Sequence, residues 1–186
     1  MGGMDMMLDR EGLPLDDPRA WRSGVVAELG LAEGGSPDSA LDSVVALAST
    51  VTGWPIAAMT FVDDERQWWP ASTAWPWSGS SREHSICARV IESGQPVLVH
   101  DLSRLEHLAQ VSLVATGQVG AYAGVPVVCR DGVPLASLCV MRPEVGGLEP
   151  ERLEVLRGLA QLLAVELETR LQFARRAVRA ETRLVA

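Results

Sequence analysis

The feature that most constrains the fold is a pair of apolar segments separated by Asp131-Gly132. Residues 121–129 and 134–141 are rich in β-branched and small apolar residues, and Asp-Gly is a preferred dipeptide for a tight hairpin turn. A hairpin pairs its strands antiparallel, and the resulting sheet must cover at least one face with other elements. We therefore predict an antiparallel sheet with helices packed on it, an α+β architecture.

Other segments of the chain predict the helices and the remaining strands. Asp17-Pro18 and Ser36-Pro37 are typical of helix starts, because an N-cap side chain is followed by a proline in the first turn. A long helix is expected to open at Glu149-Pro150 and to reach about Leu184. The other expected elements are a second strand pair, a short helix, a further strand and a partly helical segment, over residues 56–62, 67–73, 86–93, 96–100 and 102–117.

The 186 residues suit one domain with extensions at both ends. We expect an N-terminal arm with a short helix over residues 1–35, the domain itself over 36–168 and a C-terminal helical extension over 169–186. No apolar run approaches the roughly 20 residues of a membrane span, and the first residues lack the basic and apolar regions of a signal peptide. These features predict a cytoplasmic protein that does not bind membranes.

Charge and residue content exclude several kinds of chemistry. The formal net charge is −8, which argues against nucleic-acid binding, because such binding uses excess cationic residues. All 16 basic residues are arginine, so catalysis through a lysine Schiff base is excluded. Three widely spaced cysteines without a Cys-x-x-Cys pair argue against a zinc knuckle and against a thioredoxin-type motif.

The order and spacing of several short blocks resemble the GAF domain family, over about residues 37–168. The blocks are Val62-Asp63-Asp64-Glu65-Arg66-Gln67-Trp68-Trp69, Ser85-Ile86-Cys87 with Val90-Ile91, Val97-Leu98-Val99 with Asp101, Tyr122-Ala123-Gly124-Val125-Pro126 with Asp131-Gly132 and Leu138-Cys139-Val140, and Leu148 with Leu156 and Leu159-Ala160. They are most similar to GAF domains found ahead of histidine kinases and diguanylate cyclases. One segment departs from the family, because Glu106-His107-Leu108 replaces the common acidic-Arg-Phe sequence.

The resemblance implies a GAF-like central antiparallel sheet with the N- and C-terminal helices on one face and a ligand pocket on the other. Segments 74–95 and 102–120 would enclose that pocket. We accordingly expect a sensory or regulatory domain that binds an unidentified small molecule and signals through its terminal helices, and not an enzyme. Candidate ligand-binding residues, named from the resemblance and from strand alternation without deciding which face lines the pocket, are Met59, Phe61, Trp69, Trp75, Trp77, Cys87, Tyr122, Gly124 and Cys139.

Two alternatives to ligand sensing remain open. One is a ligand-free module that dimerises or docks a signalling partner. The other is a redox sensor or reductase that uses Cys87 or Cys139, although the cysteine spacing does not resemble that of GAF-type methionine sulfoxide reductases. A bilin chromophore is disfavoured because Cys87 is followed by Ala88, whereas bilin-binding GAF domains carry histidine there.

Two further hypotheses concern the edges of the domain. Trp75 and Trp77 flank Pro76 in a loop that is expected to form a lid or wall of the ligand site. The long helix is expected to form a homodimer, because a set of its residues approximates a heptad seam: Leu153, Leu156, Ala160, Leu163, Leu167, Ala174 and Ala177. Arg170 interrupts that seam.

Overall fold

The computed structural model describes residues 17–31, 38–74, 79–129 and 132–185, with side chains up to residue 177. The tryptophan loop, residues 75–78, lies outside these ranges. Fourteen elements follow one another along the chain: α1 (Pro18–Glu28), α2 (Ser39–Thr52), β1 (Ile56–Val62), β2 (Arg66–Ser72), β3 (Gly79–Ser81), η1 (Arg82–His84), α3 (Ile86–Ser93), β4 (Val97–Val99), η2 (Leu102–Arg104), α4 (Glu106–Ala109), α5 (Ser112–Ala115), β5 (Ala121–Val128), β6 (Pro134–Arg142) and α6 (Pro150–Val185).

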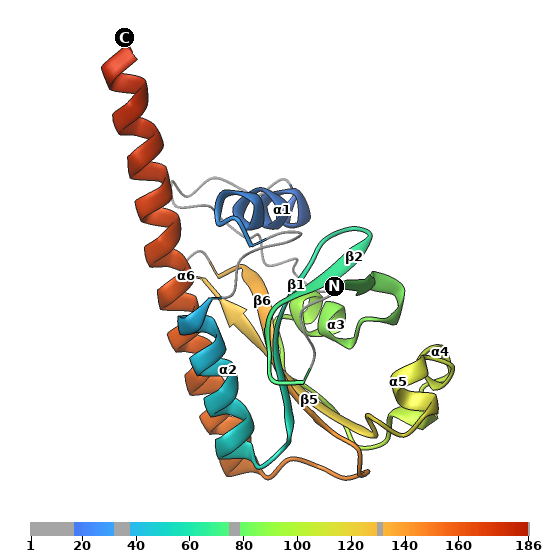
Figure 1. Ribbon diagram of the computed structural model, residues 1–186. Helices are drawn as coiled ribbons and strands as arrows, with labels where there is room; N and C mark the ends of the chain where they lie inside the picture. Colours follow the sequence, from blue (N-terminus) through green and yellow to red (C-terminus); the bar gives the residue numbers. More distant parts are fainter. Residues whose placement is uncertain (1–16, 32–37, 75–78, 130–131, 186) are drawn as a thin grey trace, which may run out of the picture.

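The strands form one antiparallel sheet in the order β3-β2-β1-β6-β5-β4 (Figure 1). The predicted hairpin is β5–β6, in which Val125 pairs with Leu138. The register shifts near the turn, between Val127 and Val128, so that Val128 pairs with Pro134. These findings confirm the expected α+β architecture.

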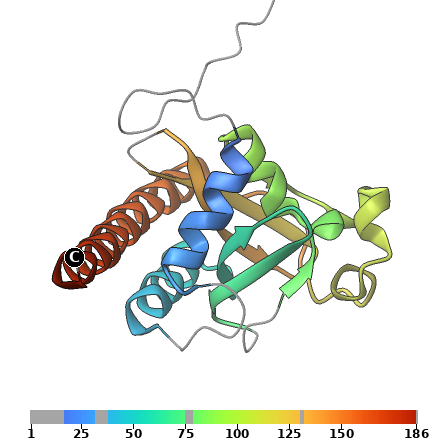
Figure 2. The same cartoon turned by 90° about the horizontal axis from the view of Figure 1, so that it is seen from above.

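Helices cover both faces of the sheet. The α2 and α6 helices pack on one face, α3 and the segment from η2 to α5 lie on the other, and α1 crosses one end of the sheet (Figures 1 and 2). Because both faces of the central strands are covered, every residue of β1 is buried. The short apolar run at residues 56–62 is therefore explained by burial on both sides.

Capping residues place the helix ends. Asp17 accepts hydrogen bonds from the backbone of the first turn of α1, as expected from Asp17-Pro18. The start of α2 differs from the prediction, because its N-cap is Asp38, whose carboxylate accepts from the backbone N–H groups of Ala40 and Leu41. Gly53 closes α2 in the left-handed conformation, with φ of 69°. The α6 helix begins and ends close to its expected limits.

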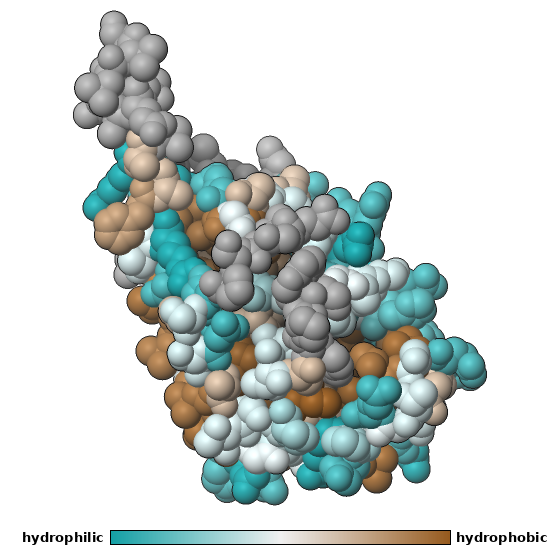
Figure 3. Space-filling model, in the orientation of Figure 1, coloured by the Kyte–Doolittle hydropathy of each residue, from teal (hydrophilic) through white to brown (hydrophobic). Residues whose placement is uncertain are grey.

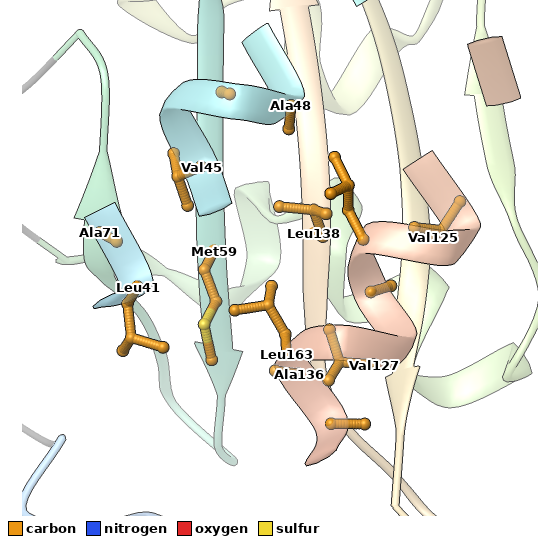
Figure 4. Packing of buried hydrophobic residues seen from close by; sticks show 14 of the residues in the cluster. Leu41, Val45, Ala48, Met59, Ala71, Val125, Val127, Ala136, Leu138 and Leu163 are labelled. Atoms are coloured by element: carbon orange, nitrogen blue, oxygen red, sulfur yellow. The ribbon is translucent and has the colours of Figure 1, made fainter. Parts of the chain in front are cut away.

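The core on the face covered by α2 and α6 contains side chains from these two helices and from alternate residues of four strands (Figure 4). Met59, Ala71, Val125 and Leu138 point from the sheet toward Leu41 of α2 and Leu163 of α6. The core on the opposite face is smaller and is built around α3, with Ile86, Val90 and Ile91 against the sheet. The α3 side therefore has fewer packed residues and borders the candidate site.

Candidate functional site

A cavity of about 110 Å³ lies on the face of the sheet opposite α2 and α6. Its apolar wall comes from the irregular segment between β4 and β5, through Leu102, Leu108, Val111, Leu113, Val114 and Val119. Short helical turns let this segment fold over the sheet: Asp101 caps η2, and the Leu102 N–H donates to the Gly120 carbonyl at 2.9 Å. The segment 102–120 thus encloses the pocket, as the sequence predicted.

The rim of the cavity carries polar side chains from β2, β3 and η1. Gln67 Nε2 donates to Ser80 Oγ at 2.6 Å, and Ser85 Oγ donates to Gln67 Oε1. The same Ser85 Oγ caps α3 by accepting from the Ala88 N–H at 3.0 Å. His84 lines the rim beside them. These bonds fix the start of α3 against the sheet and leave an edge with hydrogen-bonding groups.

Cys87, Tyr122 and Cys139 line the floor of the cavity, and the hydroxyl residues Thr60 and Ser137 lie next to them in the sheet. We define these five residues together as the floor. Each of these side chains is less than a tenth exposed. The Thr60 hydroxyl donates to Cys87 Sγ at 3.3 Å, and Tyr122 Oη lies 3.2 Å from the same sulfur. The Sγ atoms of Cys87 and Cys139 are 3.8 Å apart. The floor therefore offers hydroxyl and thiol groups under an apolar wall.

Hydrogen bonding and burial act differently on the groups of the floor. The hydrogen bond between Cys87 and Cys139 is the largest influence that lowers the pKa of Cys87 to about 7, with Thr60 and Tyr122 acting in the same direction. The pKa of Cys139 is raised well above its ordinary value by its interaction with Cys87 and by burial. Burial also raises the pKa of Tyr122, so its phenol stays protonated at neutral pH. Cys87 is the one acidic group of the floor.

The structure places the candidate residues in four groups, of which the last, Met59 and Phe61, is a correction described below. Trp69, Cys87, Tyr122 and Cys139 line the cavity. Gly124 lies beneath the Tyr122 side chain, since a Cβ at this position would be 2.2 Å from Tyr122 Oη. Trp75 and Trp77 lie outside the described residues.

Met59 and Phe61 require a correction, because they do not line the cavity. Both belong to the core under α2 and α6. The alternation of β1 directs Ala58, Thr60 and Val62 to the cavity side, so Met59 and Phe61 point the other way. The sequence left the choice of face open, and only the packing of the helices decides it.

Thr60 is a residue of the site that the sequence prediction omits, whereas strand alternation already places Ser137 on one face with Cys139. Both are fully buried hydroxyl residues in largely apolar strands. A buried hydroxyl needs a partner, so this pattern was the available signal. The six aliphatic residues of the wall had no periodic signal, because they come from short turns.

A second, open cleft of about 520 Å³ lies outside the cavity, beside η1 and α3. Its charged lining mixes both signs, with Arg82 and Arg89 beside Glu83 and Glu92. Arg82 pairs with Glu92 within the cleft, and Arg19 of α1 also reaches Glu92 at 3.3 Å. Because this cleft is open and its Arg82 is already paired with Glu92, we assign the candidate ligand site to the apolar cavity.

No helix in the described part of the chain combines the length and hydropathy needed to cross a bilayer. Residues 36–167 match the family model of the GAF domain. A cyclic di-GMP phosphodiesterase of Pseudomonas aeruginosa is 30% identical over 159 residues, which cover 84% of this chain and 27% of that protein. The chain therefore spans about a quarter of the length of this relative.

Two solved structures are similar in fold at low sequence identity. The type II free methionine-R-sulfoxide reductase of Thermoplasma acidophilum superposes with a TM-score of 0.59 at 12% identity, over 70% of this chain and 92% of that one. The GAF domain of PixJ from Thermosynechococcus elongatus, in its blue-light absorbing form, gives a TM-score of 0.58 at 18% identity, over 85% and 94% of the two chains. Both likenesses concern the fold.

Proposed function

The chain belongs to the GAF domain family, and on that premise we propose that it is a sensory domain whose cavity binds a small, largely apolar molecule. One observation carries the proposal: an aliphatic wall faces a floor of buried hydroxyl and thiol groups on the side of the sheet away from α6. Apolar pockets with a few convergent polar groups are typical of small-molecule sites. The function is binding and regulation, without catalysis.

The dimensions and polarity of the cavity narrow the ligand class. Drug-sized ligands occupy about 300–1,000 Å³, and this cavity measures about 110 Å³. A ligand that fits without rearrangement therefore has only a few non-hydrogen atoms. Its apolar part would contact Leu108 and Val114, and one polar group would reach Tyr122 or Gln67. Among the described residues, the cavity lining contains no Asp, Glu or Arg, which favours an uncharged molecule.

Contacts of α1 suggest a route from the cavity to α6. Arg19, near the start of α1, pairs with Glu92 at the end of α3, the helix that carries Cys87. Glu28, the last residue of α1, accepts from Arg175 Nε of α6 at 2.7 Å. These ion pairs are exposed and individually weak, so we assign them a positioning role. A shift of α3 on ligand binding would then move α1 against the extended part of α6.

The test is a search for bound molecules in a protein with an altered cavity. Native protein is purified, and small molecules released on denaturation are identified by mass spectrometry. Val114→Trp fills the cavity from α5, so we expect the bound molecule to fall at least about tenfold, which corresponds to about 1.4 kcal/mol of binding free energy. Ala115→Trp is the matched control, because Ala115 is the next residue of α5 and is exposed.

Two results would argue against ligand sensing. One is equal ligand content in Val114→Trp and Ala115→Trp when both proteins melt at the wild-type temperature. The other is that the wild-type protein contains no bound molecule and gains no thermal stability from a library of small uncharged compounds. A bound ligand stabilises the folded state by mass action, so a binder must raise the melting temperature.

A second candidate function, partner docking, rests on the outer face of α6. Val155, Leu162, Val165 and Phe173 are exposed there, by 46%, 61%, 58% and 66%. Hydrophobic surface gathers along the edge of the molecule where α6 runs (Figure 3). We propose that this stripe pairs with the same stripe of a second copy, because it continues over about five turns of α6 and a two-fold pair of helices would cover it. Dimerisation and ligand binding are compatible.

A further inference from the structure

Two of the three cysteines meet at the floor of the cavity. Cys87 lies in the first turn of α3, Cys139 lies in β6, and their Sγ atoms are 3.8 Å apart. Both sulfurs are buried from bulk solvent, yet both side chains line the cavity. A disulfide has an S–S length of about 2.05 Å, so the two sulfurs need to approach by roughly 1.8 Å to bond. The third cysteine, Cys129, belongs to the core on the other face.

The surroundings divide the two thiols into a nucleophile and a protonated partner. Cys87 Sγ receives hydrogen bonds from Thr60 and lies within hydrogen-bond distance of Tyr122 Oη and Cys139 Sγ. It also lies at the positive end of α3. These contacts lower the pKa of Cys87 to about 7, whereas that of Cys139 is raised. A thiolate next to a thiol is the arrangement that an attacking and a resolving cysteine require.

A buried hydroxyl at the same place lacks a partner. Ser137 Oγ is fully buried, and no described residue forms a hydrogen bond with it. Ser137 lies two residues before Cys139 on the same face of β6 and pairs with Thr60 of β1. A small polar reactant in the floor would supply the missing hydrogen bond. This observation is independent of the sulfur–sulfur distance.

We propose that Cys87 and Cys139 form a reversible disulfide when a small peroxide enters the cavity. The Cys87 thiolate attacks one peroxide oxygen, the O–O bond breaks, and the leaving oxygen takes a proton to give water or an alcohol. Cys87 is then a sulfenic acid. The Cys139 sulfur attacks the Cys87 sulfur, the S–O bond breaks, and water leaves with the Cys139 proton. Two thiols are oxidised to one disulfide, and the peroxide is reduced by two electrons.

The cavity restricts which oxidants reach the pair. Its volume of about 110 Å³ exceeds the roughly 30 Å³ that one water occupies in the liquid, so a molecule of the size of hydrogen peroxide fits. A disulfide-bearing reagent as large as glutathione does not. The proposal uses only the cavity and its floor, so it does not depend on whether the protein also binds a regulatory ligand.

The test treats the whole reduced protein with hydrogen peroxide and follows its intact mass. We expect the loss of two hydrogens, and peptide mapping without reductant should join the peptides that contain Cys87 and Cys139. Dithiothreitol should restore the mass. Cys129→Ser should react as the wild type does, because Cys129 lies apart from the pair. Cys87→Ser and Cys139→Ser should lose disulfide formation, and Cys139→Ser should instead accumulate oxygen on Cys87.

The pH dependence adds a readout that does not depend on a variant's folding. The rate of oxidation of the wild-type protein should rise with pH through about 7, following ionisation of Cys87. Any of three results overturns the proposal: a peptide map that shows another linkage or none, intermolecular disulfides as the main product, or oxidation at Cys129 before the pair. The size restriction would be contradicted if glutathione disulfide oxidised the Cys87–Cys139 pair as fast as hydrogen peroxide does.

Discussion

At the scale of single residues, the contact between Gly124 and Tyr122 shapes the floor of the cavity. The Tyr122 hydroxyl passes over Gly124 within β5, and a Cβ at residue 124 would lie 2.2 Å from Oη and 2.7 Å from Cζ. Tyr122 is 2% exposed, so its ring has little room to move. Glycine is therefore required at residue 124 because the Tyr122 ring lies too close for a side chain, and not because of the backbone conformation.

We predict that Gly124→Ala destabilises the domain by about 1–3 kcal/mol, because the added methyl group overpacks a buried ring. Gly158→Ala is the matched control, since Gly158 is exposed in α6 and no atom lies within 4 Å of its would-be Cβ. That change should stabilise the protein by up to about 1 kcal/mol. Urea unfolding of both variants measures the difference. Equal effects would show that Tyr122 does not occupy this space.

At the scale of elements, an ion pair joins α6 to the start of α2. Arg170 Nη2 donates to Asp38 Oδ1 at 3.0 Å, Arg170 Nη1 contacts Asp38 Oδ2, and Arg170 Nε donates to Glu166 at 2.6 Å. Asp38 is at the same time the N-cap of α2. Arg170, which interrupts the expected dimer seam, thus has a role within its own subunit.

We predict that Asp38→Asn lowers the free energy of unfolding by about 1–2 kcal/mol at neutral pH, because it removes a partly buried ion pair and keeps an N-cap oxygen. Asp38→Ala, which also loses the cap, should cost about 1 kcal/mol more. Chemical denaturation of the two variants separates the ion pair from the cap. The same loss in both variants would mean that only the ion pair matters.

The pH dependence of the Asp38 effect has a defined sign. The hydrogen bond from Arg170 is the largest cause that lowers the pKa of Asp38 in the folded protein. A carboxyl whose folded pKa is depressed stabilises the fold above its unfolded pKa, and this contribution is lost as the pH falls through the folded value. The stability difference between wild type and Asp38→Asn should therefore shrink in acid. A difference that persists unchanged at low pH contradicts the ion-pair explanation.

At the scale of the whole molecule, α6 is longer than the domain that it covers. Its 36 residues extend about 54 Å at 1.5 Å per residue, and its C-terminal part projects beyond the sheet (Figure 1). The expected dimer seam needs correction, because Leu156, Ala160, Leu163 and Leu167 are buried in the protein's own core. The face available for a partner is the opposite one, which carries Leu162 and its neighbours.

We predict that Leu162→Glu, combined with Val165→Glu, weakens self-association by at least about tenfold, since two charges would be placed in an apolar helix contact. Gln161→Glu is the matched control, because Gln161 is exposed on the same helix beside the stripe. Analytical ultracentrifugation over a range of concentrations gives the dissociation constants. A wild-type protein that stays monomeric at the highest concentration would exclude dimerisation through α6.

Local sequence patterns determined most of the elements of this protein. The β5–β6 hairpin, the β1 strand, the Asp17 cap and the limits of α6 follow from short-range rules on turn residues, apolar runs and capping. The grouping of Trp69, Cys87, Tyr122 and Cys139 in one region was named in advance, through the family resemblance and strand alternation. Alternation states which residues share a face, but not what covers that face.

Only the tertiary structure decided which helices pack on each face of the sheet and which face of α6 is buried. Met59 and Phe61 are candidates because alternation leaves the pocket face open, and the structure excludes them because α2 and α6 pack on their side of β1. The heptad-like residues of α6 were read as a dimer seam, but an apolar helix stripe is satisfied equally by a sheet of the same chain. The Cys87–Cys139 contact joins residues 52 positions apart. Such pairings depend on how elements pack over long chain separations, and no local spacing in the sequence records that information.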